Sequence, residues 1–115
     1  MRKKHLEVME YDRNAVVRAP GSLGKDIAEH VGAAMVSCLN KGDTRLVLDL
    51  GAAMYINSEG LRMLQEVQRH AETLEASLAL ANPNDRVMRT LNMTRMDKHL
   101  QIYKSVEDAL GNGKH

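Results

Sequence analysis

One stretch, residues 44–64, constrains the fold of this 115-residue chain more than any other. It starts with a short apolar run that ends at Leu50, and turn-forming residues follow. A run this short, bounded by turn signals, predicts a buried β-strand rather than a helix. From Gly60 onward the apolar residues recur three and four positions apart, which predicts an amphipathic helix over residues 58–73. The stretch therefore predicts a strand, a connector and a helix, with Ser58 at the N-cap of that helix.

The same signals predict further elements on both sides of this stretch. The apolar residues of segment 25–40 have helical spacing, and Gly42 just beyond it suits a left-handed C-terminal cap. Asn82 and Pro83 resemble the N-cap and first turn of a short helix. The predicted strands are residues 5–11, 15–19, 44–50, 76–81 and 100–103, with a turn at 12–14; the predicted helices are 25–40, 58–73, the short one after Asn82 that buries Val87, Met88 and Leu91, and a small one opened by Ser105.

Alternating strands and helices predict an α/β fold. We expect a mostly parallel central sheet of four to five strands with an N-terminal antiparallel hairpin, packed with about four helices. The order of the strands within the sheet stays open. A chain of this length forms one domain, residues 1–115, and residues 111–115 read as a frayed tail.

Composition and charge exclude several functional classes. Hydrophobic residues at 43% and charged residues at 27% describe an ordinary soluble globular protein. A net charge of +1 and an aromatic set of only three Tyr argue against nucleic-acid binding. We expect no membrane insertion, because no apolar run reaches transmembrane length and no signal-peptide core follows the basic start. The single cysteine, Cys38, suits a reducing cytoplasm.

Residue spacing alone reveals no catalytic or metal-binding set. The five histidines lack metal-ligand spacing, and Cys38 lies on an apolar helical stripe, where a thiol is expected to be inert. The segment Gly21-Ser22-Leu23-Gly24 lacks the lysine of a phosphate-binding loop. Most of the eight methionines are expected to fill the core. We therefore expect no metal, no cofactor and no enzymatic activity.

The segment LVLDLGAAMYINSEGLRML resembles the signature of the STAS domain of bacterial anti-sigma factor antagonists. In that family an apolar strand ending in Asp-Leu precedes a spacer and an Asp-Ser-Ser/Thr-Gly-Leu pattern. The flanking segments LNKGDTRLVLDL and ALANPNDRVMRTLNMTRMDKHLQIYKSVEDAL are also similar to the family's, so that the resemblance covers about residues 15–110.

The resemblance implies a phosphorylated switch. By position, Ser58 falls on the serine that the family's kinase-type anti-sigma factors phosphorylate. In the family the unmodified antagonist binds the anti-sigma factor, phosphorylation blocks binding, and a serine phosphatase restores it. ATP and magnesium belong to the kinase partner, an anti-sigma factor with serine kinase activity. The residues expected to face that partner are Gly21, Ser22, Met54, Tyr55, Asn57, Ser58, Glu59, Leu61 and Arg62.

The chain departs from the family pattern at four positions, so a second function stays open. Asn57 and Gly24 stand where the family has acidic residues, Glu59 replaces Ser or Thr, and Arg95 replaces a turn glycine. The alternative is an unswitched STAS partner subunit of a signalling scaffold or a membrane transporter complex. The sequence also leaves open whether the chain forms a homodimer and which sigma factor or pathway it serves.

Overall fold

Five strands form one mixed sheet in the computed structural model, which describes residues 6–111. Their order in the sheet follows the sequence, β1-β2-β3-β4-β5. The first two strands pair antiparallel and all later neighbours pair parallel, which confirms the predicted fold class. The strands are β1 (Glu7–Tyr11), β2 (Asn14–Arg18), β3 (Arg45–Asp49), β4 (Ser77–Ala81) and β5 (Gln101–Tyr103).

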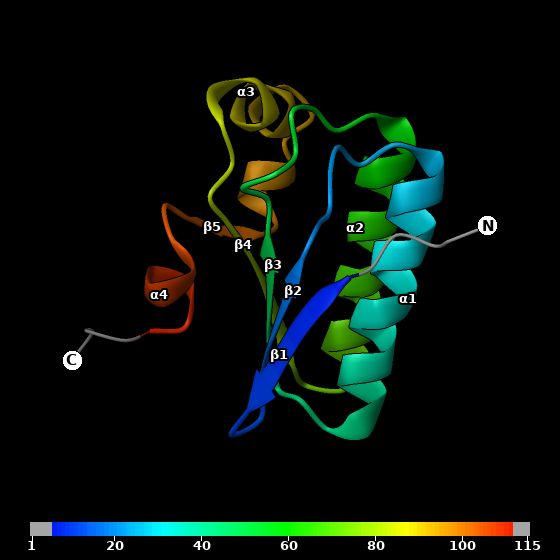
Figure 1. Ribbon diagram of the computed structural model, residues 1–115, viewed down its shortest axis with the longest axis vertical. Helices are drawn as coiled ribbons and strands as arrows, with labels where there is room; N and C mark the ends of the chain where they lie inside the picture. Colours follow the sequence, from blue (N-terminus) through cyan, green and yellow to red (C-terminus); the bar gives the residue numbers. More distant parts are fainter. Residues whose placement is uncertain (1–5, 112–115) are drawn as a thin grey trace.

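Helices cover both faces of the sheet (Figure 1). The long helices α1 and α2 lie side by side on one face, where they bury the main aliphatic core. The short α4 covers the other face through a small cluster around Val47 and Ala109. The helices are α1 (Lys25–Lys41), α2 (Ser58–Thr73), α3 (Asp85–Met93) and α4 (Val106–Ala109), with a short 3-10 helix, η1 (Met96–Lys98).

Left-handed backbone follows the helices, as at Gly42 after α1 and at Arg95 between α3 and η1. Gly42 has φ 113° and its N–H donates to the carbonyl of Leu39 at 3.1 Å, which confirms the predicted C-cap of α1. Arg95, at the position where the family has glycine, has φ 64°. An L-residue with a side chain adopts this conformation at a cost of about 1 kcal/mol. The replacement of the family's glycine by Arg95 therefore strains the backbone at this turn.

The start of α3 differs from the prediction. The N-cap is Asn84, whose Oδ1 accepts a hydrogen bond from the Val87 N–H at 2.7 Å. Asn82, the predicted cap, instead has φ 63°, and its amide donates to Asp49 Oδ1 at 3.4 Å. The prediction was wrong by two residues because both asparagines are good caps and only one is within reach of the N–H groups. The residues predicted to point inward do so in the structure: Val87 and Leu91 are buried, and Met88 is half-buried.

Smaller differences concern the hairpin, the methionines and the chain ends. The hairpin turn needs only Asp12 and Arg13, both at positive φ, so β2 begins at Asn14. His5 and residues 112–115 of the predicted tail lie outside the described residues. The methionine prediction holds in part: Met35, Met63 and Met96 are buried, whereas Met9, Met54 and Met93 are exposed.

The connections that follow β2, β3 and β4 gather at the carboxyl ends of these strands, at the top of Figure 1, where α3 also lies. This edge of a parallel sheet is where binding sites of α/β folds are built. Within residues 6–111, no helix combines the length and the apolar character needed to cross a membrane.

Candidate functional site

Helix α2 begins at this end of the sheet, and its first residue is Ser58. The N-cap is Asn57, whose Oδ1 accepts hydrogen bonds from the N–H groups of Glu59 at 3.0 Å and Gly60 at 3.1 Å. The prediction of Ser58 as the N-cap was therefore wrong by one residue. Asparagine is as good a cap as serine, and here the asparagine side chain reaches the unpaired N–H groups. The Ser58 hydroxyl is left without a capping role.

Ser58 is exposed, as the hypothesis of a modified serine requires. No histidine or carboxylate among the described residues hydrogen-bonds to its hydroxyl, so the arrangement suits an acceptor of modification better than a catalytic nucleophile. Glu59 and Arg62 are exposed beside it. Leu61 is half-buried and packs against the main core, so it offers less surface to a partner than predicted residues such as Arg62.

The connector before α2, residues 50–57, is held in place by Ser22. The Ser22 hydroxyl oxygen accepts hydrogen bonds from the N–H groups of Met54 at 2.9 Å and Tyr55 at 3.1 Å. The next residue, Leu23, forms an isolated parallel bridge with Ile56. Ser22, which was predicted to face the partner, thus uses its hydroxyl inside the chain, while Gly21 beside it is half-buried.

Two further polar residues fix the same connector from other elements. The amide of Asn84 donates to the carbonyls of Ala53 at 3.3 Å and Met54 at 3.4 Å. The carboxylate of Asp49, which is only 4% exposed, accepts from Gly51 N–H at 2.9 Å and from Arg18 Nε at 3.1 Å. No role was predicted for these two residues from the sequence, although Asp49 ends the apolar strand of the signature. The connector is therefore a preorganised surface.

Large apolar side chains are exposed on this preorganised connector. Met54 is 65% exposed and Tyr55 is 43% exposed. The guanidinium carbon of Arg86, in the first turn of α3, lies 5.6 Å from the centre of the Tyr55 ring, a cation–π contact. Tyrosine, methionine and arginine are the side chains enriched at protein interfaces. Arg86 was not among the predicted site residues, because only the fold brings α3 next to the connector.

An open groove of about 770 Å³ runs between α1 and α2 from the same end of the sheet. Its floor is apolar, with Ala28, Gly32 and Val67 among the lining residues. Glu59 and Arg62 line its edge next to Ser58. The groove therefore extends the exposed surface around Ser58 along the two helices.

Comparison with known proteins places this fold in a family. The sequence profile of the STAS domain matches residues 5–109. The chain belongs to the STAS domain family. A Thermotoga neapolitana protein, named as the homologue of a candidate anti-sigma factor antagonist, is 32% identical to this STAS chain over 72 residues. That match covers 63% of this chain and 64% of the relative, so the chain spans just under two thirds of the relative's length.

Solved structures show the same STAS fold. The crystal structure of a candidate anti-sigma factor antagonist from Thermotoga maritima superposes with a TM-score of 0.86 at 22% identity, covering 96% of this chain and 95% of that one. The anti-sigma factor antagonist SpoIIAA in its unphosphorylated form gives a TM-score of 0.79 at 17% identity, covering 93% and 94%. The Bacillus SpoIIAA in its phosphorylated form gives 0.71 at 18% identity, covering 92% and 96%.

The lone cysteine of this STAS domain lies away from Ser58, near the end of α1. Cys38 is buried, and burial together with the nearby Glu10 carboxylate raises the pKa of its thiol to about 11. A thiol with such a pKa is almost entirely protonated at neutral pH and is a poor nucleophile. This agrees with the prediction of an inert core thiol.

The cap of α2 can be tested by substitution. Replacing Asn57 with alanine leaves the N–H groups of Glu59 and Gly60 without their acceptor, so we expect the STAS domain to lose about 1 kcal/mol of unfolding free energy. Asn57→Asp, which restores the acidic residue of the family pattern, keeps an acceptor and should retain most of the stability. Urea denaturation of the three proteins measures both effects. Equal stability of Asn57→Ala and wild type would contradict the assigned cap.

Proposed function

We propose that this STAS domain is an anti-sigma factor antagonist that acts in the cytoplasm as a phosphorylation-controlled binding module. Unmodified, it binds an anti-sigma factor that has serine kinase activity; phosphorylation of Ser58 releases that partner, and a serine phosphatase restores binding. The observation that carries the proposal is the position of Ser58. It is an exposed residue at the start of α2, next to the exposed Met54 and Tyr55 of a connector held rigid by hydrogen bonds.

The geometry of the cap supports a switch that needs no refolding. A phosphate adds roughly 1.5 to 2 negative charges at one surface point. Asn57 already accepts from the N–H groups of Glu59 and Gly60, so the helix end has fewer free donors with which to draw a phosphate inward. The phosphate would remain on the surface, where a partner packed against Met54 and Tyr55 meets both its bulk and its charge.

The relatives support the same proposal. One matched relative is named as the homologue of a candidate anti-sigma factor antagonist, and the antagonist SpoIIAA, which shares the fold, exists in a phosphorylated and an unphosphorylated form. These names belong to those proteins, and their transfer to this chain depends on whether Ser58 is modified.

A phosphorylation assay tests the proposal. The purified chain is incubated with ATP, Mg²⁺ and each histidine-kinase-like serine kinase encoded in the same genome, and the product is mapped by tandem mass spectrometry. We expect one phosphate, on Ser58, and none on Ser58→Ala. Ser37→Ala, which removes an exposed serine from α1, is the matched control and should be modified like the wild type. A kinase that binds the chain stably without modifying Ser58 would contradict the switch.

The departures at Asn57, Gly24 and Glu59 favour one alternative, the unswitched STAS partner subunit of a signalling scaffold or a membrane transporter complex. In that case the same exposed surface binds its partner permanently. The two functions differ in the response to charge at position 58, because only the switched module loses its partner when that position becomes anionic.

A further inference from the structure

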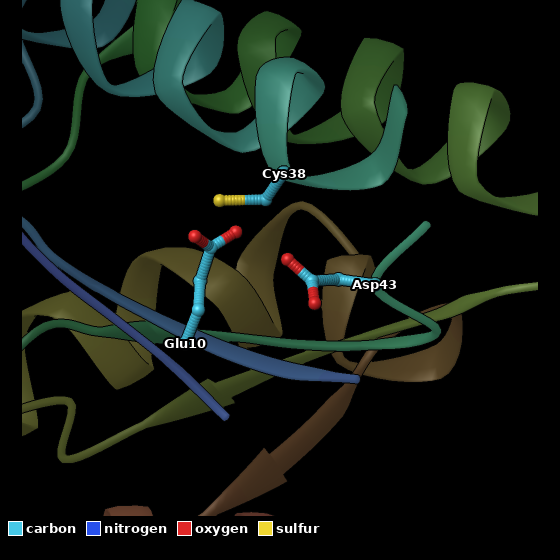
Figure 2. A group of neighbouring side chains, drawn as sticks. All are labelled: Glu10, Cys38 and Asp43. Atoms are coloured by element: carbon cyan, nitrogen blue, oxygen red, sulfur yellow. The ribbon is translucent and has the colours of Figure 1, made fainter. Parts of the chain in front are cut away.

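Three side chains with metal-binding atoms meet at the end of the sheet opposite to Ser58. They are Glu10 of β1, Cys38 in the last turns of α1, and Asp43, which directly follows the Gly42 cap. One ligand atom from each lies within 4.8 Å of the other two. Figure 2 shows the Cys38 sulfur directed at the Glu10 carboxyl group, with the Asp43 carboxyl group beside them.

Cys38 is buried and Asp43 is half-buried, so two of the three groups are largely shielded from solvent. Cys38 is only 2% exposed, and no described residue outside the cluster hydrogen-bonds to its thiol. The Oδ2 atom of Asp43 is buried without any hydrogen-bond partner. Buried polar atoms in folded proteins are normally paired, so an unpaired oxygen on a member of such a cluster calls for a ligand. Glu10 is the accessible member, and its Oε1 accepts from Lys41 Nζ at 2.9 Å.

We propose that Glu10, Cys38 and Asp43 form a binding site for a divalent metal ion of the Zn²⁺ type. One thiolate and two carboxylates are ligands that Zn²⁺ accepts, whereas the thiolate disfavours Ca²⁺ and Mg²⁺, which prefer oxygen ligands only. Zn–S and Zn–O bonds of about 2.3 and 2.1 Å place tetrahedral ligand atoms roughly 3.5 Å apart. The ligand atoms must therefore approach one another by at most about 1.3 Å, which the long, exposed side chain of Glu10 helps to permit.

Metal binding at this site exchanges the proton of the Cys38 thiol for the metal ion. The Cys38 thiol releases its proton to solvent, its sulfur forms the bond to the metal, and a water molecule completes the coordination. The last turn of α1 adds a favourable field, because the negative end of the helix dipole attracts cations. The competing cation is Lys41, and its ion pair with Glu10 is partly exposed and correspondingly weak. A bound metal would connect the edge strand β1 to α1 and to the start of β3.

The test is a metal titration of the metal-free full chain. Zn²⁺ binding is followed by calorimetry, and Co²⁺ is followed by its absorption, since a cobalt–thiolate bond gives a near-ultraviolet charge-transfer band. We expect the wild type to bind one ion and to show the band, and Cys38→Ser to lose it. Glu10→Gln and Asp43→Asn should each weaken binding by about tenfold or more. Lys41→Met, which removes the competing cation, should strengthen binding severalfold.

Controls separate the site from adventitious binding and from misfolding. Glu107→Gln removes an exposed carboxylate from α4 and should bind like the wild type. Circular dichroism and thermal unfolding show whether each variant is folded, and Glu10→Gln, at an exposed position, keeps the test valid if Cys38→Ser is unstable. The proposal is overturned if Co²⁺ gives no charge-transfer band, or if folded Glu10→Gln binds Zn²⁺ as tightly as the wild type. This result is independent of the function proposed for Ser58.

Discussion

Replacing Ser58 with aspartate is expected to weaken binding of the anti-sigma factor partner by about 100-fold or more. The substitution places a permanent negative charge on the first residue of α2, beside the exposed Met54 and Tyr55. A charge left unpaired in a desolvated interface costs about 3 kcal/mol, and every 1.4 kcal/mol is a factor of ten in the dissociation constant. Isothermal titration calorimetry with the partner identified by the phosphorylation assay measures the change.

Two control variants make this prediction specific. Ser58→Ala removes the acceptor hydroxyl without adding charge and should bind within about threefold of the wild type, because isolated surface contacts contribute little to affinity. Ser37→Asp adds the same charge at an exposed position of α1 and should also bind normally. If Ser58→Asp binds as tightly as Ser58→Ala, the chain is an unswitched partner subunit.

The elements of the fold could be predicted because their apolar residues follow a clear period. The run that ends at Leu50 and the helical stripe from Gly60 to Ala71 gave β3 and α2 to within one residue at each end. The order of the strands could not be predicted in the same way, because it depends on which neighbour each strand pairs with. That choice is made by packing between distant parts of the chain.

The candidate site was also predicted only in part. Ser58 was placed at the start of α2 from the sequence, but the N-cap role predicted for it was wrong, because Asn57 and Ser58 are equally good caps by residue type. Only the geometry shows that Asn57 Oδ1 reaches two N–H groups.

The longer-range contacts could not be predicted from the sequence. Ser22 lies more than thirty residues from the N–H groups that it accepts from, and Arg86 lies as far from the Tyr55 ring. The cluster of Glu10, Cys38 and Asp43 is of the same kind, since its members come from β1, α1 and the connection to β3. Metal-ligand spacing in a sequence indicates sites whose ligands are close along the chain, and it does not indicate ligands that a sheet edge and a helix end bring together.

Gly60 is the position at which the smallest substitution is expected to damage the fold most. A Cβ atom on Gly60 would lie 2.6 Å from the carbonyl oxygen of Leu23 and 2.7 Å from Cγ1 of Ile56. The Leu23 carbonyl cannot easily withdraw, because it accepts from the Asn57 N–H at 3.3 Å. Overpacking of this kind lowers the free energy of unfolding by about 3 kcal/mol, and the better helix propensity of alanine raises it by about 1 kcal/mol. We therefore expect Gly60→Ala to lower the unfolding free energy by about 2 kcal/mol.

Gly32 provides the matched control for this prediction. It lies in α1, and a Cβ atom there would meet Cγ of Met63 at 2.8 Å, which is part of a flexible side chain rather than backbone. The methionine can change rotamer, so the steric cost and the gain in helix propensity nearly cancel in Gly32→Ala. Thermal unfolding should show a melting temperature lowered by roughly 8 °C for Gly60→Ala and nearly unchanged for Gly32→Ala. Equal melting temperatures of the two variants would mean that the contact between Leu23 and α2 yields, and that the surface around Ser58 is less rigid than its hydrogen bonds indicate.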